Sequence, residues 1–267
     1  MLGGFCFSAI SGTARGETSH DGAMTDSATE QEPRTGEDEP RREPIFNLAG
    51  VVTAIIGLCI AIHVLRVYLL SPDADDRLIL HFAFLPIRYS GEYPIDFFAL
   101  ISPLTYAFLH GSAAHLMLNM IWLAAFGSPL AHRIGTARFL AFWIATSLAA
   151  VLLHFVLHSS DPSPLIGASG AVSGMTGAAA RFDFRINRSA GKPGFAGPVL
   201  PLAQVLRSRM AVAFIVVWFV VNLVVGLASG SNGTPRIAWE AHIGGFLVGF
   251  LAIRLFDRPP QAIGAPD

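Results

Sequence analysis

Long apolar runs alternate with short polar stretches along most of this 267-residue chain. A helix needs about 20 residues to cross the roughly 30 Å hydrocarbon layer of a bilayer. Five of the runs reach that length, whereas a sixth is too short to cross from one surface to the other. The pattern predicts an all-α polytopic membrane protein with helices at roughly Asn47–Leu70, Ala113–Ala131, Ala137–Leu157, Leu165–Ala180, Met210–Ala228 and Ile237–Phe256.

The short fourth run, Leu165–Ala180, carries a consequence of its own. Such a helix must begin inside the membrane, below a loop that lines a cavity, because unpaired backbone is not tolerated against lipid. Water could therefore reach the first residues of this helix.

Composition agrees with residence in a membrane. The chain is 52% hydrophobic and only 14% charged, whereas soluble domains carry about a quarter charged residues. We expect no nucleic-acid partner, although the net charge of −1 does not by itself bear on that point. Two cysteines, Cys6 and Cys59, are too few for a disulfide framework.

The domain organisation follows the same contrast between polar and apolar segments. Residues 1–44 are polar and are predicted to form a disordered cytoplasmic tail. Residues 45–258 form the predicted membrane domain, and residues 259–267 form a short C-terminal tail. Met24 opens a stretch that is typical of a soluble N-terminus, so we also consider it as an alternative start.

The distribution of Arg and Lys predicts the orientation, because these residues are enriched in cytoplasmic loops. One side of the predicted membrane domain has only Arg77, Arg88 and Arg236 in its loops. The loop between the fourth and fifth helices, on the other side, holds Arg181, Arg185, Arg188, Lys192, Arg207 and Arg209. We therefore expect a multi-pass protein of the cell inner membrane with both termini in the cytoplasm.

Polar groups inside membrane helices are costly, so each requires a reason. The first cluster is Gly167-Ala168-Ser169-Gly170, which opens the short fourth helix. A helix N-terminus presents unpaired N–H groups and a positive dipole end, which suits a nucleophile whose substrate develops negative charge. The alternative is that Ser169 caps the helix and the glycines serve packing.

The second cluster lies in the last helix, where His242 stands above Gly245, Gly249 and Ala252. The fourth helix offers a matching stripe of small residues, Gly170, Ser173, Gly174 and Gly177. Two such faces let helix backbones approach closely, which would bring the imidazole of His242 to the hydroxyl of Ser169. The alternative is a packed, hydrogen-bonded histidine with no part in catalysis.

The third cluster comprises His110, His115 and Asn119. His115 and Asn119 are four residues apart and share a helix face, and both side chains can donate hydrogen bonds. Together with the N–H of Ser169 they could form an oxyanion hole. Two alternatives remain: a polar seam between helices, and a metal site made by His110, His115 and His242.

Together these clusters resemble the motifs of the rhomboid family of intramembrane serine proteases. Residues 104–120 resemble its second-helix pattern His-x4-His-x3-Asn, GASG resembles its GxSG motif, and AHIGGFLVG resembles its last-helix pattern. The resemblance covers roughly residues 45–258 and implies a bacterial-type six-helix bundle with a short central fourth helix.

The resemblance implies a Ser-His dyad, with Ser169 as nucleophile and His242 as general base. It implies an oxyanion hole made by His115, Asn119 and the Ser169 N–H. It also implies structural roles for His110, Gly167, Gly170, Gly245 and Gly249. Many bacterial relatives have a tyrosine, stacked on the catalytic histidine, where this chain has Ser173, so another ring such as Trp239 could take that place.

The implied activity is endopeptidase cleavage of transmembrane segments, with transmembrane proteins as substrates and the lipid bilayer as surroundings. No metal or organic cofactor is implied, and the oligomeric state is left open. The alternative function is a non-catalytic rhomboid-like protein that binds transmembrane client helices. Glu240 lies two residues before His242, off the face of the histidine, and is not expected to join the dyad.

Overall fold

A computed structural model describes residues 47–188, 192–229 and 237–257. Within these ranges, five helical segments are long and apolar enough to cross a membrane. Two of them contain a π-helical stretch: Leu65–Leu69 prolongs α1 (Gly50–Val64), and Leu123–Gly127 joins α4 (Ala113–Trp122) to α5 (Ser128–Ile134). The other three are α6 (Thr136–Leu157), α9 (Arg209–Ala228) and α10 (Trp239–Phe256). The expected all-α polytopic membrane fold is confirmed.

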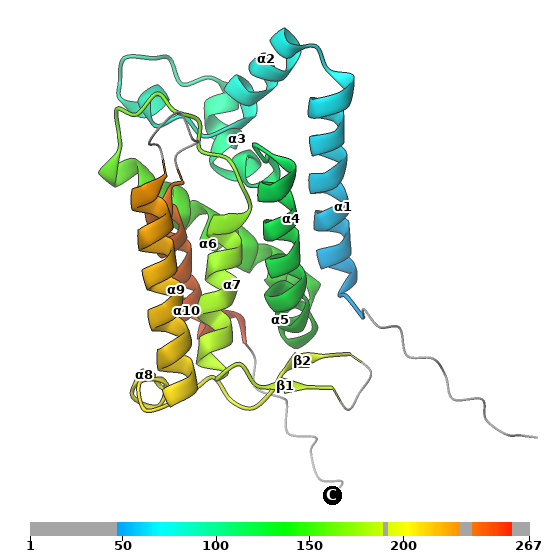
Figure 1. Cartoon of the computed structure of the whole chain (residues 1–267), viewed down its shortest axis with the longest axis vertical. Coiled ribbons are helices and arrows are strands. Elements are labelled where there is room, and N and C mark those ends of the chain that lie inside the picture. The colour runs from blue at the N-terminus through cyan, green and yellow to red at the C-terminus, as the bar shows by residue number, and fades with distance from the viewer. Residues whose placement is uncertain (1–46, 189–191, 230–236, 258–267) are drawn as a thin grey trace, which may run out of the picture. The chain divides into compact units, whose positions relative to one another are not determined.

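The short helix α7 (Ser169–Arg181) has 13 residues and lies inside the bundle (Figure 1). At about 1.5 Å per residue it is roughly 20 Å long, less than the hydrocarbon layer. Every residue after Ser169 is buried, mostly Gly, Ala, Ser and Thr, and the helix contacts α10, α6 and α4. The segment that precedes α7 is held to the chain before α3, because Leu165 exchanges two backbone hydrogen bonds with Phe84. This pairing places the start of α7 below the end of the bundle.

The segment between α1 and α4, which lies outside the six helices predicted from the sequence, contains two helices. These are α2 (Pro72–Phe82) and α3 (Phe97–Thr105), followed by 3-10 turns at Pro86–Tyr89 and Tyr106–Phe108. Local capping explains their starts: Pro72 occupies the first turn of α2, and the Asp96 carboxylate accepts from the Ala99 N–H at 2.7 Å.

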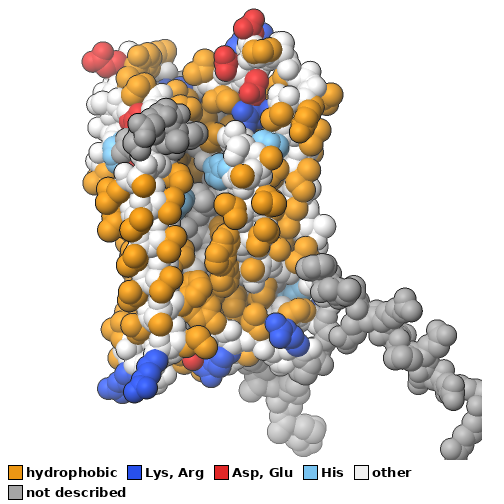
Figure 2. Space-filling model, viewed as in Figure 1, with side chains coloured by type: hydrophobic (Ala, Val, Ile, Leu, Met, Phe, Trp, Pro, Cys, Tyr) orange, Lys and Arg blue, Asp and Glu red, His pale blue; other side chains and the backbone are white. Residues whose placement is uncertain are grey.

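At the opposite end of the bundle, a small hairpin and a short helix connect α7 to α9 (Figure 1). Ile186–Asn187 (β1) pairs antiparallel with Gly194–Phe195 (β2), and Leu202–Val205 forms α8. In the face seen in Figure 2, Lys and Arg side chains gather at this end, Asp and Glu gather at the other, and hydrophobic side chains fill the band between them. This distribution is typical of a protein that crosses a bilayer.

The contact between α7 and α10 is built from backbone. A Cβ on Gly245 would collide with the carbonyl of Gly170, and a Cβ on Gly249 would collide with the carbonyl of Gly174. The two helices therefore pack closer than any side chain would allow, as in other small-residue helix pairs. This glycine seam, defined by Gly170, Gly174, Gly245 and Gly249, sets the distance between residues on α7 and α10.

Candidate active site

Ser169 is the first residue of α7, and the backbone before it is fixed in one conformation. Gly167 has a φ of +126°, which side-chain-bearing residues rarely adopt, and its N–H donates to the Tyr106 carbonyl at 3.0 Å. A Cβ at Gly167 would also lie 2.8 Å from Nε2 of His115. The Ser169 hydroxyl therefore sits at a helix N-terminus, where unpaired N–H groups and the helix dipole favour negative charge.

His242 comes from the first turns of α10 and reaches across the glycine seam. Its Nε2 lies 2.8 Å from Oγ of Ser169, within hydrogen-bonding distance. Both side chains are half-buried, and the face between α9 and α4 is hollowed in Figure 2. Gly170 and Gly245 lie directly below the pair, so their missing side chains permit the approach of the Ser169 and His242 side chains.

Asn222 of α9 completes a hydrogen-bonded chain that the sequence analysis missed. Its Oδ1 lies 2.6 Å from Nδ1 of His242, and its Nδ2 donates to the Trp218 carbonyl at 2.8 Å. Because Nδ2 is committed as a donor, Oδ1 accepts from a protonated Nδ1 of His242. The imidazole then has an unprotonated Nε2, which accepts the hydrogen of the Ser169 hydroxyl.

A signal for Asn222 was present in the sequence. It is a polar residue in the middle of the apolar run 210–228, and such residues face a partner inside the bundle as a rule.

Ser173, where a stacking tyrosine was expected, is buried in α7. Trp239, considered as its replacement, packs against Gly226 of α9. Among the described residues, a hydrogen bond rather than an aromatic ring holds the Nδ1 side of His242.

His115 and Asn119 lie on α4, on the side of the site opposite α10. Nε2 of His115 faces the Gly167 backbone, one residue before the N-cap of α7. The Asn119 side chain donates to the His115 carbonyl at 3.0 Å, and its amide carries a second hydrogen. The structure thus places His115 against the backbone just before Ser169, whereas the side chain of Asn119 is hydrogen-bonded to the backbone of its own helix.

His110 is buried in the turn before α4. Its carbonyl accepts hydrogen bonds from Nη1 of Arg66 at 3.0 Å and from Nδ1 of His63 at 3.2 Å, both from the α1 segment. Its ring lies edge-on to that of His115, with 5.2 Å between centroids. Burial, with a smaller contribution from His115, lowers the pKa of His110 to about 3, so the ring is neutral.

The three histidines considered as a metal site are used differently. His242 is engaged with Ser169 and Asn222, whereas His110 and His115 contact each other. Among the described residues, the group that could hold a metal ion is instead His154, His158 and Glu240, from α6 and α10. Glu240 faces α6, away from the Ser169–His242 pair, in line with its spacing from His242.

Comparison with known proteins gives one family. The sequence model of the Rhomboid domain matches residues 98–258. RHOMBOID-like protein 5 of Arabidopsis thaliana is 30% identical over 153 residues, 57% of this chain and 42% of that protein. Rhomboid protease GluP of Bacillus subtilis is 28% identical over 167 residues, 61% and 27% of the two chains. Rhomboid protease GlpG of Yersinia pestis is 25% identical over 207 residues, 76% and 62%. The chain thus matches less than two thirds of the length of each of these relatives.

Proposed function

The chain belongs to the rhomboid family, and on that premise we propose that it is an intramembrane serine endopeptidase that cleaves transmembrane segments of other proteins. The observation that carries this proposal is the hydrogen-bonded chain from Ser169 through His242 to Asn222, with distances of 2.8 and 2.6 Å. A serine hydroxyl bonded to a base that is itself oriented by a third group is the arrangement used for nucleophilic catalysis.

The reaction begins with attack of Oγ of Ser169 on a peptide carbonyl carbon, while its proton moves to Nε2 of His242. The oxyanion that forms is stabilised by the Ser169 N–H, His115 and Asn119, each donor contributing about a hundredfold or more in rate. For Asn119 this requires its amide to turn towards the substrate. The C–N bond then breaks, and His242 gives its proton to the leaving amine.

Water completes the cycle by attacking the acyl-enzyme, with His242 again taking a proton. The partly buried dyad, which keeps some exposure at the start of a helix shorter than the membrane, supports access of water to this step. The substrate must unwind near the cleaved bond, because a helical peptide bond is shielded by its own turn. Asn222 acts as a positioning residue, since it contacts His242 and not the reacting carbonyl.

The surroundings of the enzyme follow from the same proposal. Transmembrane proteins are the substrates, and they reach the dyad from the lipid bilayer. The gathering of Lys and Arg at the hairpin end of the bundle supports a multi-pass inner-membrane protein with that end in the cytoplasm. The helix α9, with Phe214 and Trp218, is the proposed lateral gate.

The test compares cleavage of a model transmembrane substrate by the full chain in detergent with cleavage by Ser169→Ala and His242→Ala variants. We expect each to lose about a thousandfold or more in rate while keeping its thermal melting curve. Ser173→Ala, one turn further along α7, is the matched control and should stay active.

A fluorophosphonate probe separates the two candidate functions. We expect the probe to label the wild-type chain at Ser169 and to leave Ser169→Ala unlabelled. A folded wild-type chain that neither cleaves nor labels would overturn the protease proposal and favour a non-catalytic protein that binds transmembrane clients.

A further inference from the structure

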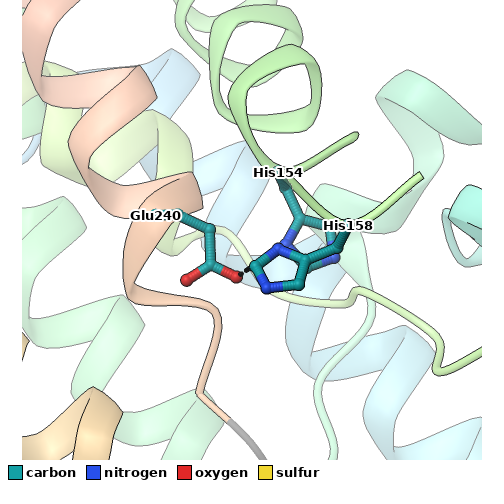
Figure 3. A group of neighbouring side chains, drawn as sticks. All are labelled: His154, His158 and Glu240. Atoms are coloured by element: carbon teal, nitrogen blue, oxygen red, sulfur yellow. Dashed lines mark hydrogen bonds and ion pairs between the residues drawn. The ribbon is translucent and has the colours of Figure 1, made fainter. Parts of the chain in front are cut away.

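Three side chains that the proposed reaction does not use converge where α6 ends and α10 begins. His154 lies in the last turn of α6, His158 caps that helix, and Glu240 lies in the first turn of α10. Figure 3 shows both imidazoles turned towards the carboxylate. Glu240 and His242 are on the same helix but face different neighbours, α6 and the dyad respectively.

The ligand atoms already lie close to the spacing of a metal site. Nδ1 of His154 is 3.0 Å and Nδ1 of His158 is 3.1 Å from Oε1 of Glu240, and all three atoms lie within 4.8 Å of one another. In a tetrahedral zinc site with bonds of about 2.0–2.1 Å, neighbouring ligand atoms are separated by roughly 3.3 Å. A small adjustment of the side chains would therefore admit a cation.

The identity of the donors selects the kind of ion. Two imidazoles and one carboxylate are a ligand set used by zinc proteins, whereas calcium and magnesium prefer oxygen ligands throughout. An ordinary ion pair needs only one imidazole for each carboxylate, but here two converge on the same oxygen.

Burial supplies both rigidity and access. The side chains of His154 and Glu240 are 5% and 1% exposed, so they are held by the surrounding helices. The His158 side chain is 25% exposed, which leaves a path from solvent and room for a water as fourth ligand. Binding would move the Nδ1 hydrogens to Nε2 or release them to solvent.

We propose that His154, His158 and Glu240 bind a zinc ion that fastens the end of α6 to the start of α10. The site lies outside the dyad and does not depend on the chain being a protease. Zinc would stabilise the helix that carries His242 without taking part in bond cleavage.

The experiment measures zinc bound to the full chain, purified in detergent without a polyhistidine tag. The protein is stripped with a chelator, dialysed against zinc chloride and analysed by mass spectrometry for metal content, with cobalt absorption spectra to report tetrahedral nitrogen and oxygen ligands. We expect one zinc per chain and a rise in melting temperature on adding zinc.

The variants His158→Ala and Glu240→Gln should bind zinc at least about tenfold more weakly. They should also lose the zinc-dependent rise in melting temperature. His81→Ala, which removes a partly exposed histidine of α2 outside the cluster, is the matched control and should behave like the wild type.

His158 is partly exposed, so its variant should fold, and its melting curve without zinc checks this. Zinc content at the level of a protein-free blank in the wild type would overturn the proposal. Unchanged binding in both His158→Ala and Glu240→Gln would overturn it equally. Because cleavage is not measured, failure of this test is distinguishable from failure of the proposed protease activity.

Discussion

The helices α10 and α9 both supply a residue to the hydrogen-bonded chain at Ser169, but they are held to the bundle very differently. In the membrane-spanning part of α10, 39% of the residues are buried, and the helix packs backbone against backbone along the glycine seam. In the corresponding part of α9 only 11% of the residues are buried, and its outward face is a continuous apolar surface. His242, the proposed general base, therefore stands on a fixed helix, and Asn222, which is hydrogen-bonded to it, stands on a loosely held one.

This difference suggests a division of labour. The Ser169–His242 distance depends on the seam, where a displacement would require two backbones to separate. Under the proposed function, access of a substrate helix would depend on α9, whose ring contacts with α10 are the stacked pair Trp218–Phe246 and the edge contact Phe219–Phe246. Aromatic contacts contribute about 0.5–1.5 kcal/mol each, so they can open without unfolding the bundle.

Breaking the seam should have the largest effect. Gly249→Ala places a Cβ against the Gly174 carbonyl, and overpacking of this kind costs about 1–3 kcal/mol or more. We expect a lower melting temperature and loss of cleavage together. Gly57→Ala on α1 is the matched control, because a Cβ there meets nothing within 4 Å. Equal melting temperatures for the two variants would contradict a seam that fixes α10.

Removing the positioning residue should have an intermediate effect. In Asn222→Ala the Nδ1 hydrogen of His242 loses its acceptor, and one hydrogen bond is worth about 1 kcal/mol, which corresponds to several-fold in rate. We expect kcat to fall by about fivefold while KM and the melting temperature stay unchanged. Asn222→Asp keeps an acceptor oxygen and should retain more activity than Asn222→Ala.

Val221→Ala is the control for that measurement, since Val221 is an exposed neighbour on the same helix. A change confined to KM, or equal losses in Asn222→Asp and Asn222→Ala, would mean that Asn222 does not orient the base.

Loosening α9 should have the smallest effect, and in the opposite direction. Trp218→Ala removes the ring stacked 4.6 Å from Phe246 but leaves the carbonyl that holds Asn222. We expect a rise of a few fold in the cleavage rate of a transmembrane substrate and no change for a short soluble peptide. A parallel change for both substrates would show that α9 does not control access.

The sequence predicted the parts of this structure that obey simple periodic rules. The lengths of the membrane spans were predicted from the apolar runs. The close approach of α7 to α10 was predicted from glycines at helical spacing on both segments. The glycine spacing left the contact between Ser169 and His242 as one of two alternatives, and the resemblance to the rhomboid family decided between them. Such features are visible because lipid imposes strict requirements on helix length and backbone pairing.

Other features depend on contacts between residues distant in the chain. Nothing near Asn222 in the sequence indicates that its partner is His242, because that pairing requires the packing angle of α9 on α10. The convergence of His154 and His158 on Glu240 likewise joins two helices that are distant in the sequence, since His154 and Glu240 are 86 residues apart. The helices α2 and α3 were missed because their short, mixed sequences lack the long apolar run of a span.

In the proposed enzyme, the hydrogen bond between Asn222 and His242 would link the substrate entrance at α9 to the general base. At 2.6 Å it is short, and such bonds weaken steeply once the atoms separate or misalign. An outward swing of α9 that admits a substrate would stretch this bond first, so the base would be poorly oriented while the entrance stands open. Closure of α9 around the bound segment would restore the hydrogen bond. The same movement of α9 would then control both substrate entry and the orientation of His242.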